Sequence, residues 1–287
     1  MSRRGQMAGK PSEPTRRRRA KRNGWAYTLV ALQALCVLLP LAVVFIWAFT
    51  ASWPWPNLVP ESLSARGIED LFAPQQHMPQ ILATSIGVAL ATALLSTLVA
   101  GMAARAICHY RPRGRDVVEF GMLLPLIIPS TVFAMGVQVA FTKAGLTGTV
   151  VGVVLSHTII ALPYAAMIMV DTTAAAGTKM EEVARVSGAS SLQLLRTVTV
   201  PQLLPGILSS ASMGFIISFS QYFITLIIGG GKVKTLALIM FPYLSSGDRT
   251  MASAYGAVFL VVIFAVFLLF EVLLRKQANR DVGYFNG

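Results

Sequence analysis

Six long apolar segments, separated by short polar stretches, dominate the pattern of this chain. Each is long enough to cross the hydrocarbon core of a bilayer as a helix. Hydrophobic residues make up 55% of the chain and charged residues only 13%, which is far from the average soluble domain. The pattern predicts an all-α membrane protein with six transmembrane helices, near Tyr27–Phe49, Ile81–Ala104, Val117–Phe141, Gly148–Val170, Leu204–Ile228 and Ala252–Leu274.

A polar connection between the fourth and fifth segments, residues 178–203, is rich in helix-capping signals. Capping boxes, in which a hydroxyl and a carboxylate or amide satisfy the first helical amides, are expected at Thr178–Glu181, Ser190–Gln193 and Thr199–Gln202. Gly188 can take a left-handed conformation at no steric cost and so end a helix. The spacing predicts two short helices joined by a tight turn, a shape that can contact a soluble partner.

The distribution of Lys and Arg predicts the orientation of the chain. Basic residues concentrate in alternate polar segments: the amino-terminal tail, residues 105–115, residues 179–196 and the segment after the last span. The opposite set of segments has only Arg66, Lys143, Lys232, Lys234 and Arg249. Because Lys and Arg favour the cytoplasmic side, both termini and the 178–203 connection are expected in the cytoplasm. The basic tail lacks interleaved aromatic residues, which favours contact with anionic lipid over binding of nucleic acid.

Residues typical of catalysis are not grouped in this sequence. Cys36 and Cys108 are far apart, as are the three histidines, and no acid lies near the middle of a predicted span. The segment Gly229–Lys232 has a superficial phosphate-loop composition, but Val233 stands where Ser or Thr should follow. We therefore expect no catalytic residues, no metal site and no cofactor, and energy for any transport must come from another subunit.

The 178–203 connection also resembles a family signature. Glu182-Val183-Ala184, three residues, Gly188, nine residues and then Val198-Thr199-Val200-Pro201 is similar to the EAA loop of permease subunits of binding-protein-dependent ABC importers. Val183 departs from the usual Ala. The resemblance implies the type I, MetI-like permease fold, with a core over residues 78–276. A basic tail (1–24), a first span with an outer loop (25–77) and a carboxyl-terminal tail (277–287) would be additions.

Looser motifs narrow the resemblance to permeases for polyamines and aminoethylphosphonate. Permeases for iron, thiamine, molybdate or sulfate share much of this pattern, so the solute stays open, and Gln221 stands where relatives often carry an acid. The motifs are Trp53-Pro54-Trp55-Pro56, Ser218-Phe219-Ser220-Gln221-Tyr222-Phe223 and Leu236-Ala237-Leu238-Ile239-Met240-Phe241-Pro242.

The resemblance also implies partners and site residues. The partners would be two ATP-binding subunits, a second permease subunit, like or unlike, and an extracytoplasmic solute-binding protein, all at the cytoplasmic membrane of a prokaryote. The residues expected to couple the chain to the ATPase are Glu181, Glu182, Ala184, Gly188, Ala189, Ser190 and Pro201. The residues expected along the solute pathway are Ser218, Ser220, Gln221 and Tyr222 in the fifth span, with His157 in the fourth. For each pathway residue, hydrogen bonding between helices is the alternative role.

Two other classes of function stay open on the sequence alone. A channel or secondary transporter working by itself is disfavoured by the missing charges at mid-membrane and by the docking-type connection. An integral-membrane enzyme is disfavoured because no cluster of acids, His or Cys lies at a membrane face.

Overall fold

The computed structural model describes residues 13–54, 56–110 and 113–285, almost all of them helical. The first part of the basic tail, Trp55 and Arg111 lie outside these residues. A two-stranded antiparallel hairpin, β1 (Thr50–Ser52) and β2 (Ser62–Leu63), is the small exception in the described chain. The helices are α1 (Glu13–Ala48), α2 (Arg66–Leu71), α3 (Met78–Arg105), α4 (Arg115–Ile127), α5 (Ser130–Lys143), α6 (Val150–Ala176), α7 (Lys179–Val186), α8 (Ser191–Leu194), α9 (Val200–Phe219), α10 (Phe223–Gly229), α11 (Leu236–Ser246) and α12 (Arg249–Phe285). Shorter helical turns cover Pro74–Gln76, Ala106–Tyr110 and Leu195–Thr199.

Five of the described helical segments are long and apolar enough to cross a membrane, and a bent pair makes up to six. The five lie within α1, α3, α6, α8 to α9, and α12, and the pair is α4 with α5. The predicted all-α membrane architecture is therefore confirmed.

The third span is not the single straight helix expected over Val117–Phe141. It consists of α4 and α5, which meet at an angle of 109°. Pro129 has no amide hydrogen to continue the helix, and it forces the preceding Ile128 out of the helical region, to φ −81° and ψ 130°. As a result α4 packs against α6, while α5 turns away and contacts α10.

The fifth span, expected as one helix over Leu204–Ile228, is also interrupted. Helix α9 ends at Phe219 and α10 begins at Phe223, so that Ser220, Gln221 and Tyr222 lie in a break. Neither Pro nor Gly occurs in this break. The backbone carbonyl of Gln221 instead accepts a hydrogen bond from the Thr225 hydroxyl, as described below.

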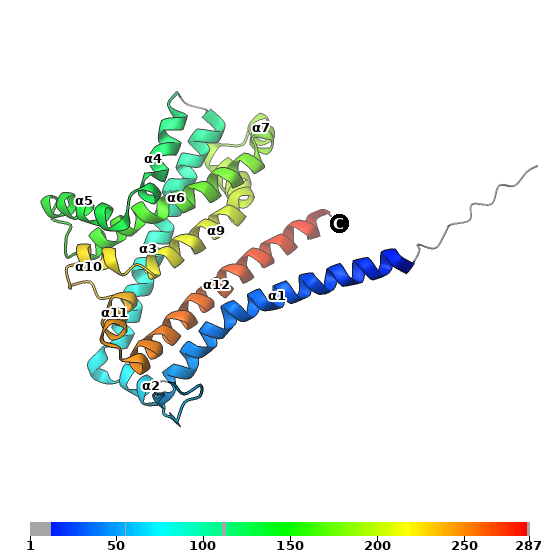
Figure 1. Cartoon of the computed structure of the whole chain (residues 1–287). Coiled ribbons are helices and arrows are strands. Elements are labelled where there is room, and N and C mark those ends of the chain that lie inside the picture. Colours follow the sequence, from blue (N-terminus) through cyan, green and yellow to red (C-terminus); the bar gives the residue numbers. More distant parts are fainter. Residues whose placement is uncertain (1–12, 55, 111–112, 286–287) are drawn as a thin grey trace, which may run out of the picture.

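The centre of the molecule is a bundle of α3, α6 and α9, which pack tightly along most of their lengths (Figure 1). Small residues allow this close approach, as is usual between membrane helices. A Cβ added to Gly214 would lie 2.8 Å from the Ser96 hydroxyl and 3.1 Å from the Ala93 backbone. A Cβ added to Gly206 would collide with Thr172. These contacts fix α9 against α3 on one side and α6 on the other.

Helices α1 and α12 form a pair that runs beside this bundle (Figure 1). Few residues in their apolar windows are fully buried, 0% and 6%, as expected for helices with one side toward lipid or another membrane subunit. The pair is joined at one end, where the Arg249 guanidinium lies 5.4 Å from the Trp47 ring centre and Thr250 donates a hydrogen bond to the Thr50 carbonyl at 3.0 Å.

Candidate functional site

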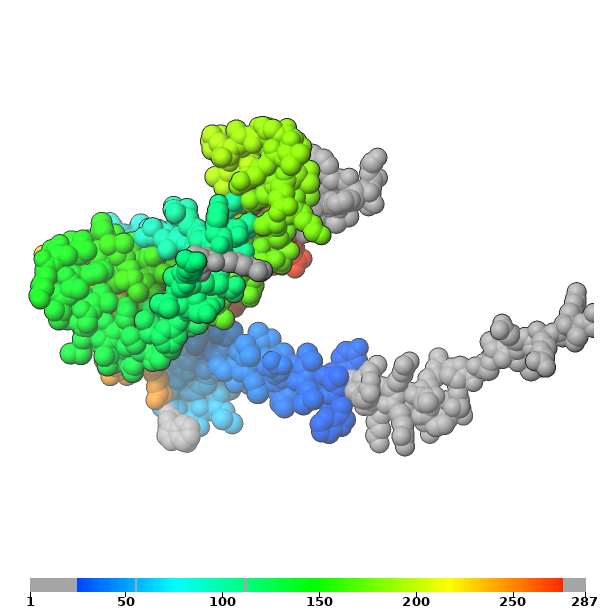
Figure 2. Space-filling model, turned by 90° about the horizontal axis from the view of Figure 1, so that it is seen from above, coloured from blue at the N-terminus to red at the C-terminus, as the bar shows by residue number. Residues whose placement is uncertain are grey.

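The 178–203 connection projects from one end of the central bundle, where α7 lies at the upper end of the molecule (Figure 1). Figure 2 shows the same segment as a yellow-green lobe standing out from the body of the molecule. The connection joins the end of α6 to the start of α9. It therefore lies at the end of the bundle where these two helices meet it. The coupling residues expected from the sequence therefore gather on one exposed projection.

A buried ion pair attaches α7 to the bundle. Glu181 in α7 is only 6% exposed, and both its carboxylate oxygens accept hydrogen bonds from the guanidinium of Arg105, at 2.9 and 3.1 Å. Arg105 is the last residue of α3. Two parallel hydrogen bonds between guanidinium and carboxylate are the strongest and most directional form of ion pair. The end of a long membrane helix is thus clamped to the projecting helix.

Thr199, immediately before α9, completes this contact. Its hydroxyl donates a hydrogen bond of 2.6 Å to the Glu181 carboxylate, and its side chain is itself buried. Burial by itself would raise the pKa of Glu181, but the hydrogen bonds from Thr199 and Arg105 and the charge of Arg105 outweigh burial and hold this pKa below its ordinary value. Glu181 is therefore ionised at neutral pH and joins α3, α7 and the start of α9.

This contact corrects part of the sequence prediction. The expected capping boxes at Thr178–Glu181 and Thr199–Gln202 are wrong: neither threonine makes a side-chain cap. Glu181 and Thr199 hydrogen-bond to each other because the fold brings them together across the turn. The expected cap at Ser190 is confirmed on its hydroxyl side, which accepts from the Gln193 amide at 3.3 Å.

The exposed side of α7 carries apolar side chains among its charged ones. The side chains of Val183 and Val186 are 63% and 91% exposed, although Glu181 on the same helix is buried. Exposed apolar residues on the neighbouring turns extend this surface, which we call the α7 patch: Met180, Val183, Val186, Leu192 and Leu195. Lys179, Glu182 and Arg185 of the same helix are also exposed, so the α7 patch is an apolar surface rimmed by charged side chains, as is usual where one protein contacts another.

The turn after α7 has the geometry expected from the sequence. Gly188 has φ +86°, a conformation in which a side chain is strained. Apart from the two neighbouring residues, no atom of the described part of the chain lies within 4 Å of the position that a Cβ would take there. Ala184 and Ala189 are half-buried and joined by a backbone hydrogen bond of 3.0 Å, while Glu182, Ser190 and Pro201 are exposed.

Two of the expected pathway residues, His157 and Ser218, lie in a buried polar network. Nδ1 of His157 is 2.8 Å from the Ser218 hydroxyl and Nε2 is 3.0 Å from the Thr225 hydroxyl. Ser218 also contacts the Thr92 hydroxyl at 3.2 Å. The network therefore joins α3, α6, α9 and α10 inside this chain, which is the arrangement of inter-helix hydrogen bonds.

The other three pathway residues occupy the break between α9 and α10. Gln221, expected at the middle of a continuous span, is half-buried in this break, and its carbonyl accepts from Thr225 at 2.8 Å. Tyr222 stacks on Phe241 with ring centres 3.8 Å apart, and Ser220 is exposed. The polar network thus satisfies a backbone group released by the break, while the amide group of Gln221 stays outside it.

Sequence reasoning missed the residues that complete both sites. From the sequence, Arg105 contributes only to the membrane orientation, Thr199 is expected only as a local helix cap, and Thr92 and Thr225 have no expected role. Nothing local identifies them, because their partners are far away in sequence. One signal in the sequence could have suggested the Arg105–Glu181 pair. Arg105 is a basic residue at the end of an apolar span, and Glu181 belongs to a pair of acids at the start of a short helix.

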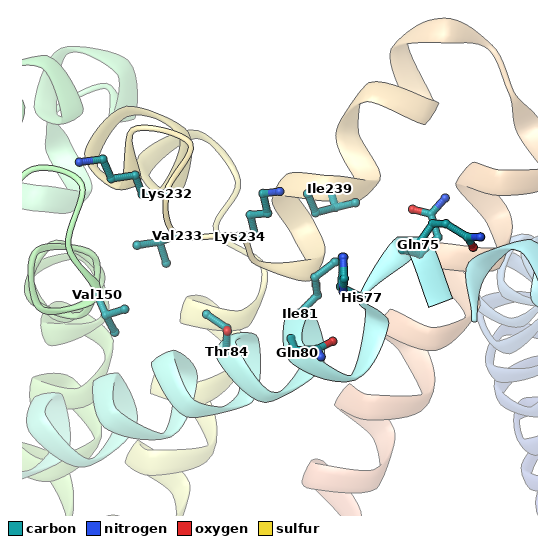
Figure 3. A pocket seen from close by; sticks show the side chains of 11 residues that line it. Gln75, His77, Gln80, Ile81, Thr84, Val150, Lys232, Val233, Lys234 and Ile239 are labelled. Carbon is teal, nitrogen blue, oxygen red and sulfur yellow. The ribbon is translucent and has the colours of Figure 1, made fainter. Parts of the chain in front are cut away.

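A cavity of about 460 Å³ opens at the other end of α3. It lies between the start of α3, the start of α6 and the turn before α11 (Figure 3). Polar and basic side chains line much of it, including Gln76, His77, Gln80, Thr84, Lys232 and Lys234. Within the described residues, no three His, Cys, Asp or Glu side chains are grouped as metal ligands.

Comparison with known proteins shows which family this chain resembles in sequence. A family model described as "binding-protein-dependent transport system inner membrane component" matches residues 96–279. The spermidine/putrescine transport system permease protein PotC of Haemophilus influenzae is 26% identical over 193 residues, 67% of this chain and 75% of that protein. The molybdenum transport system permease protein ModB of the same organism is 24% identical over 218 residues, 70% of this chain and 95% of that protein.

A solved structure supports the same fold. A chain of a bacterial ABC transporter involved in the import of the acidic polysaccharide alginate superposes with a TM-score of 0.66, at 17% identity, and the match covers 93% of this chain and 99% of that one. The MetNI methionine ABC transporter, in inward-facing form, gives a TM-score of 0.52 at 16% identity, over 70% of this chain and 98% of that one.

Proposed function

Because the chain belongs to the family of inner membrane components of binding-protein-dependent transport systems, we propose that it forms half of a solute pathway whose movements are driven through α7 by a separate ATPase. The matched region covers more than half of the chain and includes the last part of α3, all of α4 to α11 and all but the last residues of α12. The projecting helix and the membrane helices that it would move thus lie within the family region.

The observation that carries this proposal is the exposed apolar surface of α7. Glu181 is buried against the bundle, while the α7 patch is exposed on a projection. In water, the exposed valines have no partner in this chain, and their burial would contribute about 25 cal/mol per Å² of apolar surface. An ATPase with an apolar groove fits this surface, and the ion pair of Glu181 with Arg105 would pass its movement to α3.

The proposed cycle is alternating access. Two permease subunits, like or unlike, sit on two ATPase subunits, and an external binding protein delivers the solute. ATP binding closes the ATPase pair, and closure favours one permease conformation because the ATPases bind that conformation more tightly. In this proposal the chain contributes the coupling helix α7 and half of the solute pathway, and ATP is hydrolysed by the partner subunit.

The charge pattern supports placing α7 and both termini in the cytoplasm. Arg105, Arg113, Arg115 and Arg185 all lie at the α7 end of the bundle or in the segments that connect there. The opposite end would face the solute-binding protein outside the membrane.

The solute that we propose to test first is a polyamine or a related small organic solute. PotC proteins of several bacteria are among the relatives with this similarity, at 22–26% identity. ModB and the sulfate permease protein CysT of Salmonella typhimurium, 24% identical over 225 residues, support oxyanions as the second class. Titration of the partner binding protein with polyamines, phosphonates, molybdate and sulfate would decide between these classes.

The docking proposal is tested with Val186→Asp in the α7 patch. A charge at the most exposed apolar position should prevent burial in the ATPase groove and reduce the amount of ATPase that co-purifies with the chain at least tenfold. Tyr110→Asp, at an exposed position at the same end but outside the patch, is the matched control and should keep the ATPase bound. Equal recovery of ATPase with both variants would remove the α7 assignment.

A further inference from the structure

The cavity at the start of α3 is a site for negative charge. Lys232 and Lys234 line it from the turn before α11, and His77 lines it from the start of α3. In Figure 3 the side chain of Lys232 points away from those of Lys234 and His77. None of the described residues that line it is Asp or Glu. In the described part of the chain, neither lysine takes part in an ion pair. The positive charge of the cavity is therefore uncompensated.

The two lysines are held on a defined turn. Val233, between them, is buried in a cluster with Val153 and Ile228, so the turn is anchored to the bundle and both lysines stay at the surface. The turn closes through a hydrogen bond of 2.9 Å from the Lys232 amide to the Gly229 carbonyl. A Cβ added at Gly148 would lie 3.3 Å from Cδ of Lys232, so the stem of this lysine lies on the Gly148 backbone.

The backbone adds to the positive potential. Helices α3 and α11 both begin beside the cavity, and the amino-terminal end of a helix carries a partial positive charge. His77, the residue that precedes α3, has φ 50°, a left-handed conformation that is uncommon for a residue other than Gly. This turn brings Gln76 and Gln80 to the cavity as hydrogen-bonding groups, and Gln76 lies 3.4 Å from the Tyr255 hydroxyl.

We propose that this cavity receives a carboxylate side chain of the solute-binding protein when that protein docks. The inference rests on the proposed function, which places this end of the bundle outside the membrane and supplies the partner. Lysine ammonium groups bind carboxylates through charge-assisted hydrogen bonds. A polyamine, the solute proposed above, is itself a cation and is repelled by Lys232 and Lys234. With a polyamine as the solute, the acidic group therefore belongs to the docking protein.

An exposed pair of lysines acts mainly on the rate of encounter. Charges at the rim of an interface steer association and make it sensitive to salt, while they change dissociation less. The proposal therefore predicts a docking rate that falls as salt concentration rises. Reversing the charge of the pair should slow association about tenfold at low salt.

The experiment uses the assembled transporter in lipid nanodiscs and the binding protein that stimulates its ATP hydrolysis. Association and dissociation are measured by surface-based binding at low and high salt for the unmodified complex, Lys234→Glu and the Lys232→Glu/Lys234→Glu pair. Lys143→Glu, an exposed lysine at the end of α5 that does not line the cavity, is the matched control. We expect slower association and a weaker salt dependence only for the cavity variants. A surface Asp or Glu of the binding protein changed to Lys should restore the rate with the charge-reversed complex.

Two results would overturn the inference. One is an association rate and salt dependence that the paired variant leaves unchanged. The other is normal docking with impaired uptake, which would make the solute the ligand of the cavity. Failure of the proposed function looks different, because then no binding protein stimulates hydrolysis by the unmodified complex at all.

Discussion

At the scale of single residues, we expect the loss of the Arg105–Glu181 ion pair to lower stability and coupling more than the loss of any other contact. The pair is mostly buried, with side-chain exposures of 25% and 8%. Removing one partner of a buried ion pair leaves the other charge without compensation and costs about 3 kcal/mol. The same contact carries the proposed movement of α7 to α3, so stability and coupling depend on it together.

We expect Arg105→Gln and Glu181→Gln each to lower the midpoint of thermal unfolding of the purified complex and to reduce solute-stimulated ATP hydrolysis. The double variant should be no worse than the more damaging single variant, since both charges are then absent. Arg275→Gln breaks an exposed ion pair with Glu271 and should change the midpoint little. Additive losses in the double variant would mean that the two residues do not act as a pair.

Gln221 provides a second prediction at this scale, because its amide group lies outside the buried polar network. Gln221→Leu removes donor and acceptor at similar size, and we expect reduced uptake with normal yield of the complex. Thr225→Val is the comparison variant, since it leaves a ring nitrogen of His157 and the Gln221 carbonyl without the hydroxyl. That change should lower stability by about 1–3 kcal/mol. Unchanged uptake in Gln221→Leu would end its assignment to the pathway.

At the scale of elements, the turn between α7 and α8 decides how the α7 patch is presented. Gly188 has φ +86° and open space around it within this chain. Any effect of a side chain there therefore comes from backbone strain, of order 1–3 kcal/mol, or from contact with the ATPase.

We expect Gly188→Val to reach the membrane in normal amounts but to lose solute-stimulated hydrolysis. Gly188→Asn should keep a measurable part of it, because Asn tolerates the left-handed region better than a β-branched residue. The measurement is ATP hydrolysis by the assembled complex with and without loaded binding protein. If the valine variant hydrolyses ATP as the unmodified complex does, the turn has no part in coupling.

At the scale of the whole molecule, the two ends of the bundle should lie on opposite sides of the membrane. In a variant without Cys36 and Cys108, a cysteine at Ser62 in the β-hairpin should react with an impermeant reagent in intact cells. A cysteine at Ser190 should react only after the cells are opened. Both positions are exposed on the protein. A cysteine that does not react in intact cells is therefore on the cytoplasmic side of the membrane. The reverse labelling pattern would invert the proposed orientation and with it the assignment of both partner surfaces.

The sequence alone determined the helical membrane class, the approximate places of the spans and the polar 178–203 connection with its turn at Gly188. These features are local: a run of apolar residues must become a helix to satisfy its backbone in lipid, and Gly188 and Ser190 act on their own turns. The EAA-like spacing is also a local pattern, so it identified the loop without any knowledge of its contacts.

Only the tertiary structure decided which polar groups meet. Glu181 and Thr199 each fit a local cap, yet Glu181 finds a stronger partner in Arg105, 76 positions away in the chain, because charge-assisted bonds in a buried site outweigh a solvated cap. The Thr225 hydroxyl that bonds to the Gln221 carbonyl at the break also contacts His157 of another helix. The cavity with Lys232 and Lys234 exists because the starts of α3 and α6 come to lie beside the turn before α11. Such juxtapositions depend on helix packing, which no local pattern of residues encodes.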